Sequence, residues 1–375
     1  MKSSTTVAAL MLAGVSATSL AAIFTPGNLV VSQVGDGGAA LNNAATAVSL
    51  RELTLAGTTV QSFPMPTAAS GLNRRFSVSG TATSEGMLTR STNGQYLTIA
   101  GYDAAIGTAS VVTTTAAANP RVVGRADVNG AIDTTTGLTD AYSGNNVRSV
   151  ASDDGVNFWT AGTAGGTGGG VRYTTLGSST STILSTTITN TRVVNIFSGQ
   201  LYTSSATGAF QGVSTVGSGL PTSSGNTISL LPGFPTATGP GAYDYFFSNP
   251  STLYVADDRA TASGGGLQKW TLASGTWTLA YTLNNGLTAG LRGLTGGIDP
   301  AGGVVLYATT ADAISAANGN KLVSVLDAGA ASAFTTIATA PGNTAWRGVD
   351  FTPVPAPGAL AVLGLSGLLA SRRRR

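Results

Sequence analysis

The chain has 375 residues, of which 9% are charged and 51 are glycine, and it contains neither histidine nor cysteine. Without histidine it cannot form a Ser-His-Asp triad or a histidine-ligated metal centre, and without cysteine it has no thiolate nucleophile, iron–sulfur cluster or disulfide. Glycine, threonine and serine together make up about 38% of the chain, a composition that favours turns and β-strands over helices.

The N-terminus has the pattern of a secretory signal peptide. Lys2 precedes an apolar run over residues 7–15, and small residues follow as far as Ala21 and Ala22. Because the run is shorter than a membrane span of about 20 residues, we expect cleavage at Ala21–Ala22 rather than anchoring. A buried core helix is the alternative interpretation of this segment.

Residues 22–353 form the body of the chain, in which short strand-like runs alternate with turn residues. The runs lie at residues 29–34, 96–100, 156–160, 200–203, 253–256 and 304–309, each after a turn residue, at positions 27, 94, 155, 199, 251 and 303. Several of these spacings are near 50 residues, which is typical of four-stranded propeller blades and too long for the coils of a β-helix.

Two units of the body repeat the same hairpin. Arg148-Ser149-Val150 and Arg292-Gly293-Leu294 each lead through an Asp-containing turn into a strand with an aromatic residue. Phe-Thr-Pro occurs at both boundaries of the body, at residues 24–26 and 351–353, so the chain contains a whole number of repeats, as a closed ring requires.

The body is therefore predicted to be all-β, a six- or seven-bladed β-propeller-like ring. A weak strand candidate at residues 75–80 would supply the seventh blade. A β-sandwich and an irregular solenoid remain alternatives.

Carboxylates are the only candidates for acid–base chemistry in the body, and no catalytic residue is assigned. The pairs Asp153-Asp154 and Asp257-Asp258 lie beside predicted strands, where we expect them to accept turn amides, with calcium binding as the weaker alternative. The glycine-rich residues 162–170 lack the Lys-Ser/Thr ending of a phosphate-binding loop and are interpreted as an interstrand loop.

Aromatic residues of the body are interpreted as core, with stacking on sugar rings as the alternative. This set comprises Trp159, Trp270, Trp277, Trp346, Tyr243 and Tyr245. The chain has only three lysines and no basic patch with interleaved aromatics, so it carries no electrostatic footprint for nucleic acid.

The C-terminus is the most specific feature of the sequence. A motif of Val354, Pro355, Ala356, Pro357 and Gly358 is followed by an apolar stretch over residues 359–370 and by four terminal arginines, Arg372, Arg373, Arg374 and Arg375. The two prolines favour an extended backbone. The apolar stretch would give a helix of about 18 Å, short of the roughly 30 Å bilayer core, and the arginines would stop transfer. This single short transmembrane helix suits transient anchoring.

This order of motif, apolar helix and arginine cluster, after a signal peptide, resembles the PEP-CTERM sorting signal of bacterial exported proteins. The resemblance covers residues 354–375 and implies removal of the tail by an exosortase and delivery to the cell surface or extracellular matrix. The family pattern is Val-Pro-Glu-Pro, so Ala356 departs from it. An ordinary C-terminal tail anchor is the alternative.

The sequence thus predicts an exported protein with a non-catalytic binding or structural body. Its expected partners are signal peptidase, an exosortase-like sorting enzyme, the membrane through its tail, and extracellular polysaccharide; no cofactor is expected. The alternatives are a secreted hydrolase or lyase that acts on polysaccharide through loop carboxylates, and an adhesive solenoid. A funnel with two or three clustered acidic side chains would favour the enzyme.

Overall fold

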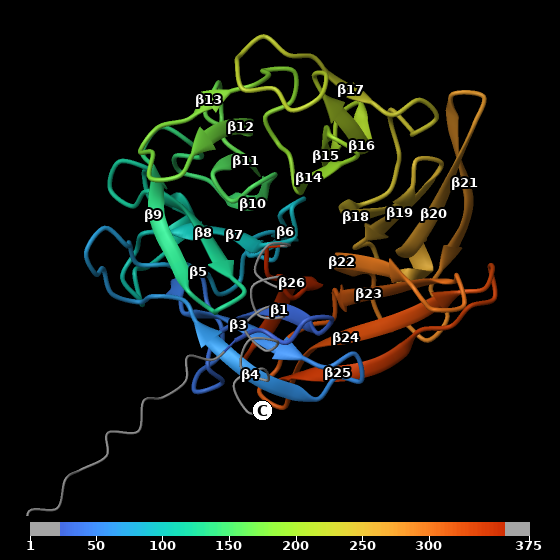
Figure 1. Cartoon of the computed structure of the whole chain (residues 1–375), viewed down its shortest axis with the longest axis horizontal. Helices are drawn as coiled ribbons and strands as arrows, with labels where there is room; N and C mark the ends of the chain where they lie inside the picture. Colours follow the sequence, from blue (N-terminus) through green and yellow to red (C-terminus); the bar gives the residue numbers. More distant parts are fainter. Residues whose placement is uncertain (1–22, 357–375) are drawn as a thin grey trace, which may run out of the picture.

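A computed structural model describes residues 23–356 as a ring of six four-stranded antiparallel sheets around a central axis (Figure 1). The predicted all-β class and propeller-like ring are confirmed. The predicted signal cleavage site at Ala21 and Ala22, the tail from Pro357 and Gly358 onward, and Arg372 to Arg375 lie outside the described residues and stay predictions.

The strands of each blade are given in order from the innermost to the outermost. Blade 1 consists of β26 (Ala345–Phe351), β1 (Leu29–Val34), β3 (Val48–Leu53) and β4 (Thr59–Pro64), and blade 2 of β6 (Leu88–Arg90), β7 (Tyr96–Tyr102), β8 (Arg121–Asp127) and β9 (Ile132–Leu138). Blade 3 consists of β10 (Val147–Ser152), β11 (Asn157–Gly162), β12 (Gly170–Thr175) and β13 (Thr182–Ile183), and blade 4 of β14 (Val194–Phe197), β15 (Gln200–Thr207), β16 (Phe210–Val216) and β17 (Ile228–Leu230). Blade 5 consists of β18 (Ala242–Asn249), β19 (Thr252–Asp257), β20 (Gly266–Ala273) and β21 (Thr276–Leu283), and blade 6 of β22 (Leu291–Ile298), β23 (Val304–Thr310), β24 (Asn318–Asp327) and β25 (Thr335–Pro341).

The six strand runs expected from the sequence all fall on the second strand of a blade, namely β1, β7, β11, β15, β19 and β23. These strands lie between an inner and a third strand and are largely buried, which explains why they are the most apolar and hence the most visible in the sequence. The hairpin before three of them turns at a glycine with positive φ, at Gly94, Gly155 and Gly199.

The ring closes because both ends of the body contribute to blade 1. The last strand, β26, pairs with the first, β1, with Phe351 opposite Leu29. The two Phe-Thr-Pro tripeptides lie together, since the Thr352 hydroxyl donates to the carbonyl of Thr25 at 2.8 Å. The closure predicted from the repeated tripeptide is confirmed, and a solenoid with free ends is wrong.

The proposed seventh blade is also wrong. Within residues 75–80 only Val78–Ser79 forms a strand, β5, which pairs with β2 (Ala45–Thr46) as a two-stranded ribbon beside the ring. Two residues are too few to build a blade, and the ribbon lies on the connection into blade 2 rather than adding a sheet. The long first repeats therefore contain extra connection, not an extra blade.

Every pair of neighbouring blades is joined near the axis by at least one side chain that bonds the backbone in, or just before, the next inner strand. Five of the links are hydroxyls that donate to a backbone carbonyl: Ser32 to Gly86, Thr98 to Val150, Ser149 to Arg192, Ser204 to Tyr243 and Thr309 to Arg347. In the sixth, the Asp244 carboxylate accepts the Leu294 amide. In three of these links the same hydroxyl also accepts an N–H from its own blade, at Gly348, Val193 and Gly293. These bonds satisfy buried backbone groups that a flat sheet edge would leave unpaired.

Apolar side chains fill the spaces between blades. All four tryptophans are at most 5% exposed, and each belongs to one of the apolar clusters between sheets. The interpretation of the tryptophans as core is confirmed. Within residues 23–356, no helix is long and apolar enough to cross a membrane.

Close approach of inner strands should make one glycine of β26 irreplaceable. A Cβ at Gly348 would overlap the backbone nitrogen of Leu88 in the next blade, whereas a Cβ at Gly297 in β22 would meet only the Phe351 ring at 3.7 Å. We expect Gly348→Ala to lower the free energy of unfolding by about 1–3 kcal/mol through overpacking, and Gly297→Ala to change it far less. Denaturant unfolding of both variants measures this, and equal effects would contradict it.

Candidate functional site

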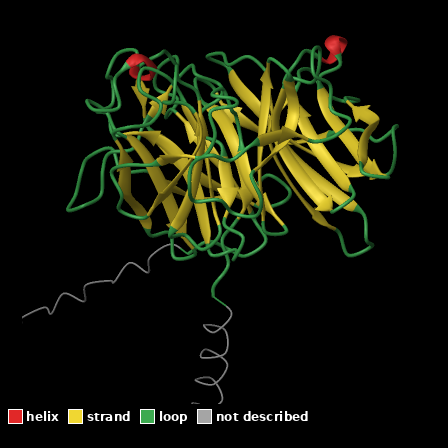
Figure 2. Cartoon of the chain, turned by 90° about the horizontal axis from the view of Figure 1, so that it is seen from above, coloured by secondary structure: helices red, strands yellow, loops and turns green. Residues whose placement is uncertain are grey.

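The two faces of the ring differ in what they carry. Both described ends, Ile23 and Ala356, lie on one face, here the lower face, while the 3-10 turns η1 (Val111–Thr113) and η2 (Thr261–Ser263) lie on the opposite, upper face (Figure 2). Because β26 runs toward Ala356, its first residues lie at the upper face. The inner strands surround the central axis, and we call the two ends of this axis the upper mouth and the lower mouth.

Near the upper mouth, five blades each contribute one large polar side chain close to the start of the inner strand. These residues are Arg148, Arg192, Tyr243, Arg292 and Arg347, from blades 3, 4, 5, 6 and 1. We call them the upper ring. In blade 2 the corresponding residue is Gly86. Its carbonyl accepts a hydroxyl of the preceding blade, from Ser32, as the carbonyls of Arg192 and Tyr243 accept the hydroxyls of Ser149 and Ser204.

Arg192 and Arg292 lie over the face of Tyr243. Their guanidinium carbons are 4.4 and 5.8 Å from the centre of its ring. A tyrosine face attracts a cation, so Tyr243 holds the two arginines toward each other although their charges repel. Tyr243 is thus a packing partner for cations rather than a free sugar platform.

Three arginines of the upper ring donate to the backbone that leads into the next blade. Arg148 donates to the Thr191 carbonyl at 2.9 Å, and Arg192 donates to the carbonyls of Gly241 and Ala242 at 3.0 and 3.1 Å. Arg347 donates to the carbonyls of Ser79, Gly80 and Ala82. Hydrogen bonds to a charged donor are about twice as strong as neutral ones, so these arginines fix the blade connections.

Arg292 departs from this pattern. Its guanidinium makes no hydrogen bond to any residue between 23 and 356, and its buried Nε has only an ion-pair contact, with Asp258. Its nearest anion is Asp258, whose carboxylate lies 3.6 Å from Arg292 and 3.6 Å from Arg192. The Arg148 Nε is also buried without a hydrogen-bond partner, but Arg292 is the one of the four arginines that donates no hydrogen bond within residues 23–356.

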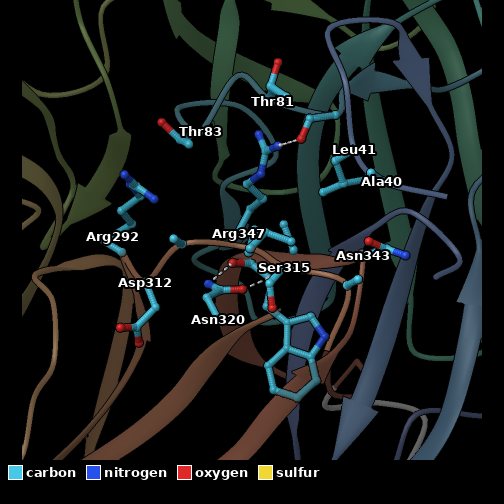
Figure 3. Close-up of a pocket in the computed structure, with 17 residues that line it drawn as sticks. Ala40, Leu41, Thr81, Thr83, Arg292, Asp312, Ser315, Asn320, Asn343 and Arg347 are labelled. Carbon is cyan, nitrogen blue, oxygen red and sulfur yellow. Dashed lines mark hydrogen bonds between the residues drawn. The ribbon is translucent and has the colours of Figure 1, made fainter. Parts of the chain in front are cut away.

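A cavity of about 420 Å³ opens where the Arg292 link is missing, between blade 6 and blade 1 (Figure 3). Arg292 and Arg347 contribute its positive charge, and Asn320 and Asn343 lie in its wall. Much of the remaining wall is apolar, formed by Leu41, Ala311, Ala313, Ile314, Ala316, Ala345 and Trp346. Such a space admits a small ligand or the end of a larger one.

Anions near this cavity are already paired. Asp312 lies 3.6 Å from the Lys321 ammonium and accepts the hydroxyls of Thr288 and Thr310 at 2.7 Å. Glu85 is buried and accepts the Asn146 side-chain amide at 2.6 Å, and burial raises the pKa of this carboxyl. The cavity itself is left with the positive charge of its arginines.

Burial also acts on the arginines themselves. It lowers the pKa of Arg347 to about 10; the charge of Glu85 opposes this effect, and the like charge of Arg292 adds to it. Burial likewise lowers the pKa of Arg148, and Arg192 contributes in the same direction. At neutral pH Arg347 stays protonated, so the repulsion within the upper ring remains and an anion would relieve it.

Three of the four carboxylates in the predicted pairs lie in turns or ion pairs, whereas an Asp153 carboxylate oxygen is buried without a hydrogen-bond partner. Asp154 accepts the amides of Val156 and Asn157 at 2.7 and 2.9 Å, as expected of turn chemistry. Asp257 is buried and accepts the Gly241 amide and the Arg259 guanidinium. Asp258 has a role that the sequence did not indicate, because it bridges two arginines of the upper ring.

No calcium cage is apparent in the described part of the chain, where no group of three or more acidic side chains is arranged to hold a metal ion. Residues 162–170 connect β11 to β12, which agrees with their interpretation as an interstrand loop.

Of the sorting motif, Val354, Pro355 and Ala356 are described. Val354 donates its amide to the carbonyl of Gly94 at 2.8 Å, and Ala356 is exposed on the lower face. The first motif residue is therefore attached to blade 2, on the opposite side of the ring from the upper cavity.

Sequence reasoning missed the upper ring, although a signal for it was present. Arg-small-apolar occurs at Arg148, Arg292 and Arg347, with Arg192-Val193-Val194 as a variant. The pattern was interpreted as a marker of the repeat. In a closed ring, however, equivalent positions of the inner strands converge on one axis, so a repeated arginine predicts a cluster of charge.

No protein-family model matches the chain, and no curated protein matches it. Among solved structures, it is similar to a GH74 enzyme of Niastella koreensis, with 16% identity, a TM-score of 0.47 and coverage of 82% of this chain. The chain spans 47% of that enzyme. It is also similar to hydrazine synthase of Kuenenia stuttgartiensis, with 12% identity, a TM-score of 0.41 and coverage of 72% of this chain and 68% of that one. Neither likeness bears on the chemistry of the upper ring.

A buried carboxyl beside the upper ring gives a prediction for pH. Asp244 follows Tyr243 in β18, is 2% exposed, and accepts the amides of Tyr245 and Leu294 at 2.8 and 3.0 Å. Burial raises the pKa of Asp244 to about 8, and the charge of Asp350 raises it further. In the unfolded chain its pKa is about 3.9.

Between these two pKa values the folded protein keeps a proton that the unfolded chain has lost, so the contribution of Asp244 to stability declines as pH rises from about 4 to 8. We expect urea unfolding at pH 5, 7 and 9 to show that wild-type protein loses stability relative to Asp244→Asn. The exposed Asp36→Asn change serves as the control. Parallel pH profiles for wild type and Asp244→Asn would contradict the assignment.

Proposed function

We propose that this chain is an exported, non-catalytic binding protein whose propeller captures an anionic ligand at its upper mouth. The observation that carries the proposal is Arg292, an arginine of the upper ring without a hydrogen-bond partner that faces the 420 Å³ cavity. Guanidinium groups recognise carboxylate, sulfate and phosphate through paired hydrogen bonds. The apolar walls suit a ligand whose anionic group sits on a less polar body.

Several features favour binding over catalysis at this mouth. Arginine is a fixed positive charge and no general base, because it does not lose its proton at neutral pH. Asp258 and Asp312, the carboxylates nearest the cavity, are both engaged by cations. A glycosidase requires two carboxylates that face one bond, and these two are held in ion pairs instead.

We further propose that the C-terminal segment from Val354 is a PEP-CTERM-like sorting signal, processed by an exosortase-like enzyme after export through the N-terminal signal peptide. Support comes from the order of motif, apolar stretch and arginines in residues 354–375. Ala356 leaves the ring on the lower face. A protein held by this tail would present the upper mouth away from the membrane, toward external ligands.

Anion binding gives the direct test of the upper mouth. We expect calorimetric titration of the full chain at low salt to detect binding of galacturonate, sulfate or inorganic phosphate, weakened by added salt. Loss of one charge-assisted hydrogen bond, worth about 1.5–3 kcal/mol, should make Arg292→Gln bind at least tenfold more weakly.

A matched control is Arg75→Gln, which removes an arginine paired with Asp103 outside the upper ring. Its affinity should equal that of the wild-type protein. The proposal fails when none of the three anions binds, or when both variants lose affinity equally.

Processing of the ends has a separate test in the native host. Mass spectrometry of the extracellular protein should find an N-terminus near Ala22 and a C-terminus near Pro357, because signal peptidase and the sorting enzyme cut at those places. An extracellular form that retains Arg375 would contradict the sorting proposal and would leave the anion site untouched.

A further inference from the structure

The lower mouth holds a second cavity, of about 290 Å³, which is built from the ends of five inner strands. Its charged groups are Arg90 of β6 and Asp350 of β26. The Asp350 carboxylate accepts the Arg90 amide at 2.7 Å and the Thr295 hydroxyl at 3.0 Å. One cation and one anion balance each other, so this mouth has no net preference for a charged ligand.

A third cavity, of about 320 Å³, lies between blades 4 and 5 and continues the lower mouth outward. The two cavities share Phe197, Ser198 and Phe247 in their walls. The two cavities adjoin at these residues and together reach from the inner strands to Trp277 in the outer strand of blade 5. We call this pair of adjoining cavities the aromatic groove.

Aromatic rings surround Phe247 along this groove. Phe197 stacks on Phe247 with ring centres 4.7 Å apart, Tyr202 lies at 4.8 Å, and Trp277 approaches edge-on at 6.0 Å. Phe197 and Tyr202 are only partly buried, so they are open to the groove while Phe247 and Trp277 form its base. Phe246 and Phe351 add rings at the end nearest the axis.

Hydrogen-bonding groups alternate with these rings. Asn195 and Ser198 lie in the wall beside Phe197. The Tyr245 hydroxyl is buried behind the wall, near the backbone amide of Asn195. The groove therefore combines flat apolar faces with polar groups and no net charge.

We propose that the aromatic groove binds a neutral saccharide chain, with sugar faces packed on Phe197 and Tyr202 and sugar hydroxyls bonded to the polar wall. Sugar rings present an apolar face and a polar rim, which is the chemistry of this groove. The groove is extended because two cavities join end to end, so it fits several linked units better than one. It is separate from the upper mouth, which takes anions.

Calorimetric titration of the full chain with maltohexaose, cellohexaose and mannohexaose tests the proposal. One of the three should bind, and Phe197→Ala should weaken that binding about tenfold, as expected for the loss of one aromatic stacking surface. Phe210→Ala is the matched control, since Phe210 is a partly buried phenylalanine of the same blade that lies outside both cavities.

Further readouts separate this site from the upper mouth and from damage to the fold. Arg292→Gln should leave the saccharide affinity unchanged, and Phe197→Ala should leave anion affinity unchanged and melt within a few degrees of Phe210→Ala. The proposal is overturned when none of the three hexasaccharides binds, when Phe210→Ala weakens binding as much as Phe197→Ala, or when Arg292→Gln abolishes it.

Discussion

The whole ring depends on one recurring hydrogen bond, in which a polar side chain of one blade bonds the inner backbone of the next. Ser32, Ser204 and Thr309 each accept an amide of their own inner strand and donate to a carbonyl of the neighbouring one. A hydroxyl suits this place because it is both donor and acceptor and occupies little space. Since two of the bonded carbonyls belong to Tyr243 and Arg347, the links that join the blades also place the upper ring.

A second layer of links, made by arginines, joins three of the six interfaces: blades 1 and 2, blades 3 and 4, and blades 4 and 5. Arg148, Arg192 and Arg347 each bind the backbone entering the next blade, whereas Arg292 at the junction of blades 6 and 1 binds none of the described backbone. Blade 1, on one side of that junction, is the blade in which β26 pairs with β1 to close the ring. Arg292, the residue proposed to bind an anion, therefore lies beside the blade that closes the ring. Loss of the pairing between β26 and β1 would remove both the fold and the cavity.

Sequence reasoning predicted what repeats along the chain and missed what depends on packing across the axis. Second strands such as residues 29–34 and 304–309 can be recognised in the sequence because burial on both sides makes them apolar. The repeated Phe-Thr-Pro indicates closure because a chain that begins and ends at the same point of its repeat contains a whole number of blades. The position of Asp258 between two arginines could not be predicted from the sequence, because its partners Arg192 and Arg292 are far from it in the chain. The seventh blade predicted from residues 75–80 was wrong because local strand propensity does not reveal that only the two residues of β5 pair with another strand.

Average charge is a poor guide to this molecule. Between residues 23 and 356 the chain has 14 basic and 16 acidic residues, yet four of the arginines lie at the upper mouth, where Asp258, Asp312 and Glu85 are the neighbouring acids. The lower mouth has one charge of each sign and a run of aromatic rings. Because the inner strands run parallel to one another, the starts of all six lie at one mouth and their ends at the other. Repeated arginines near the starts therefore make one mouth basic, while phenylalanines at the ends make the other apolar, so a single repeated blade yields two mouths of different chemistry.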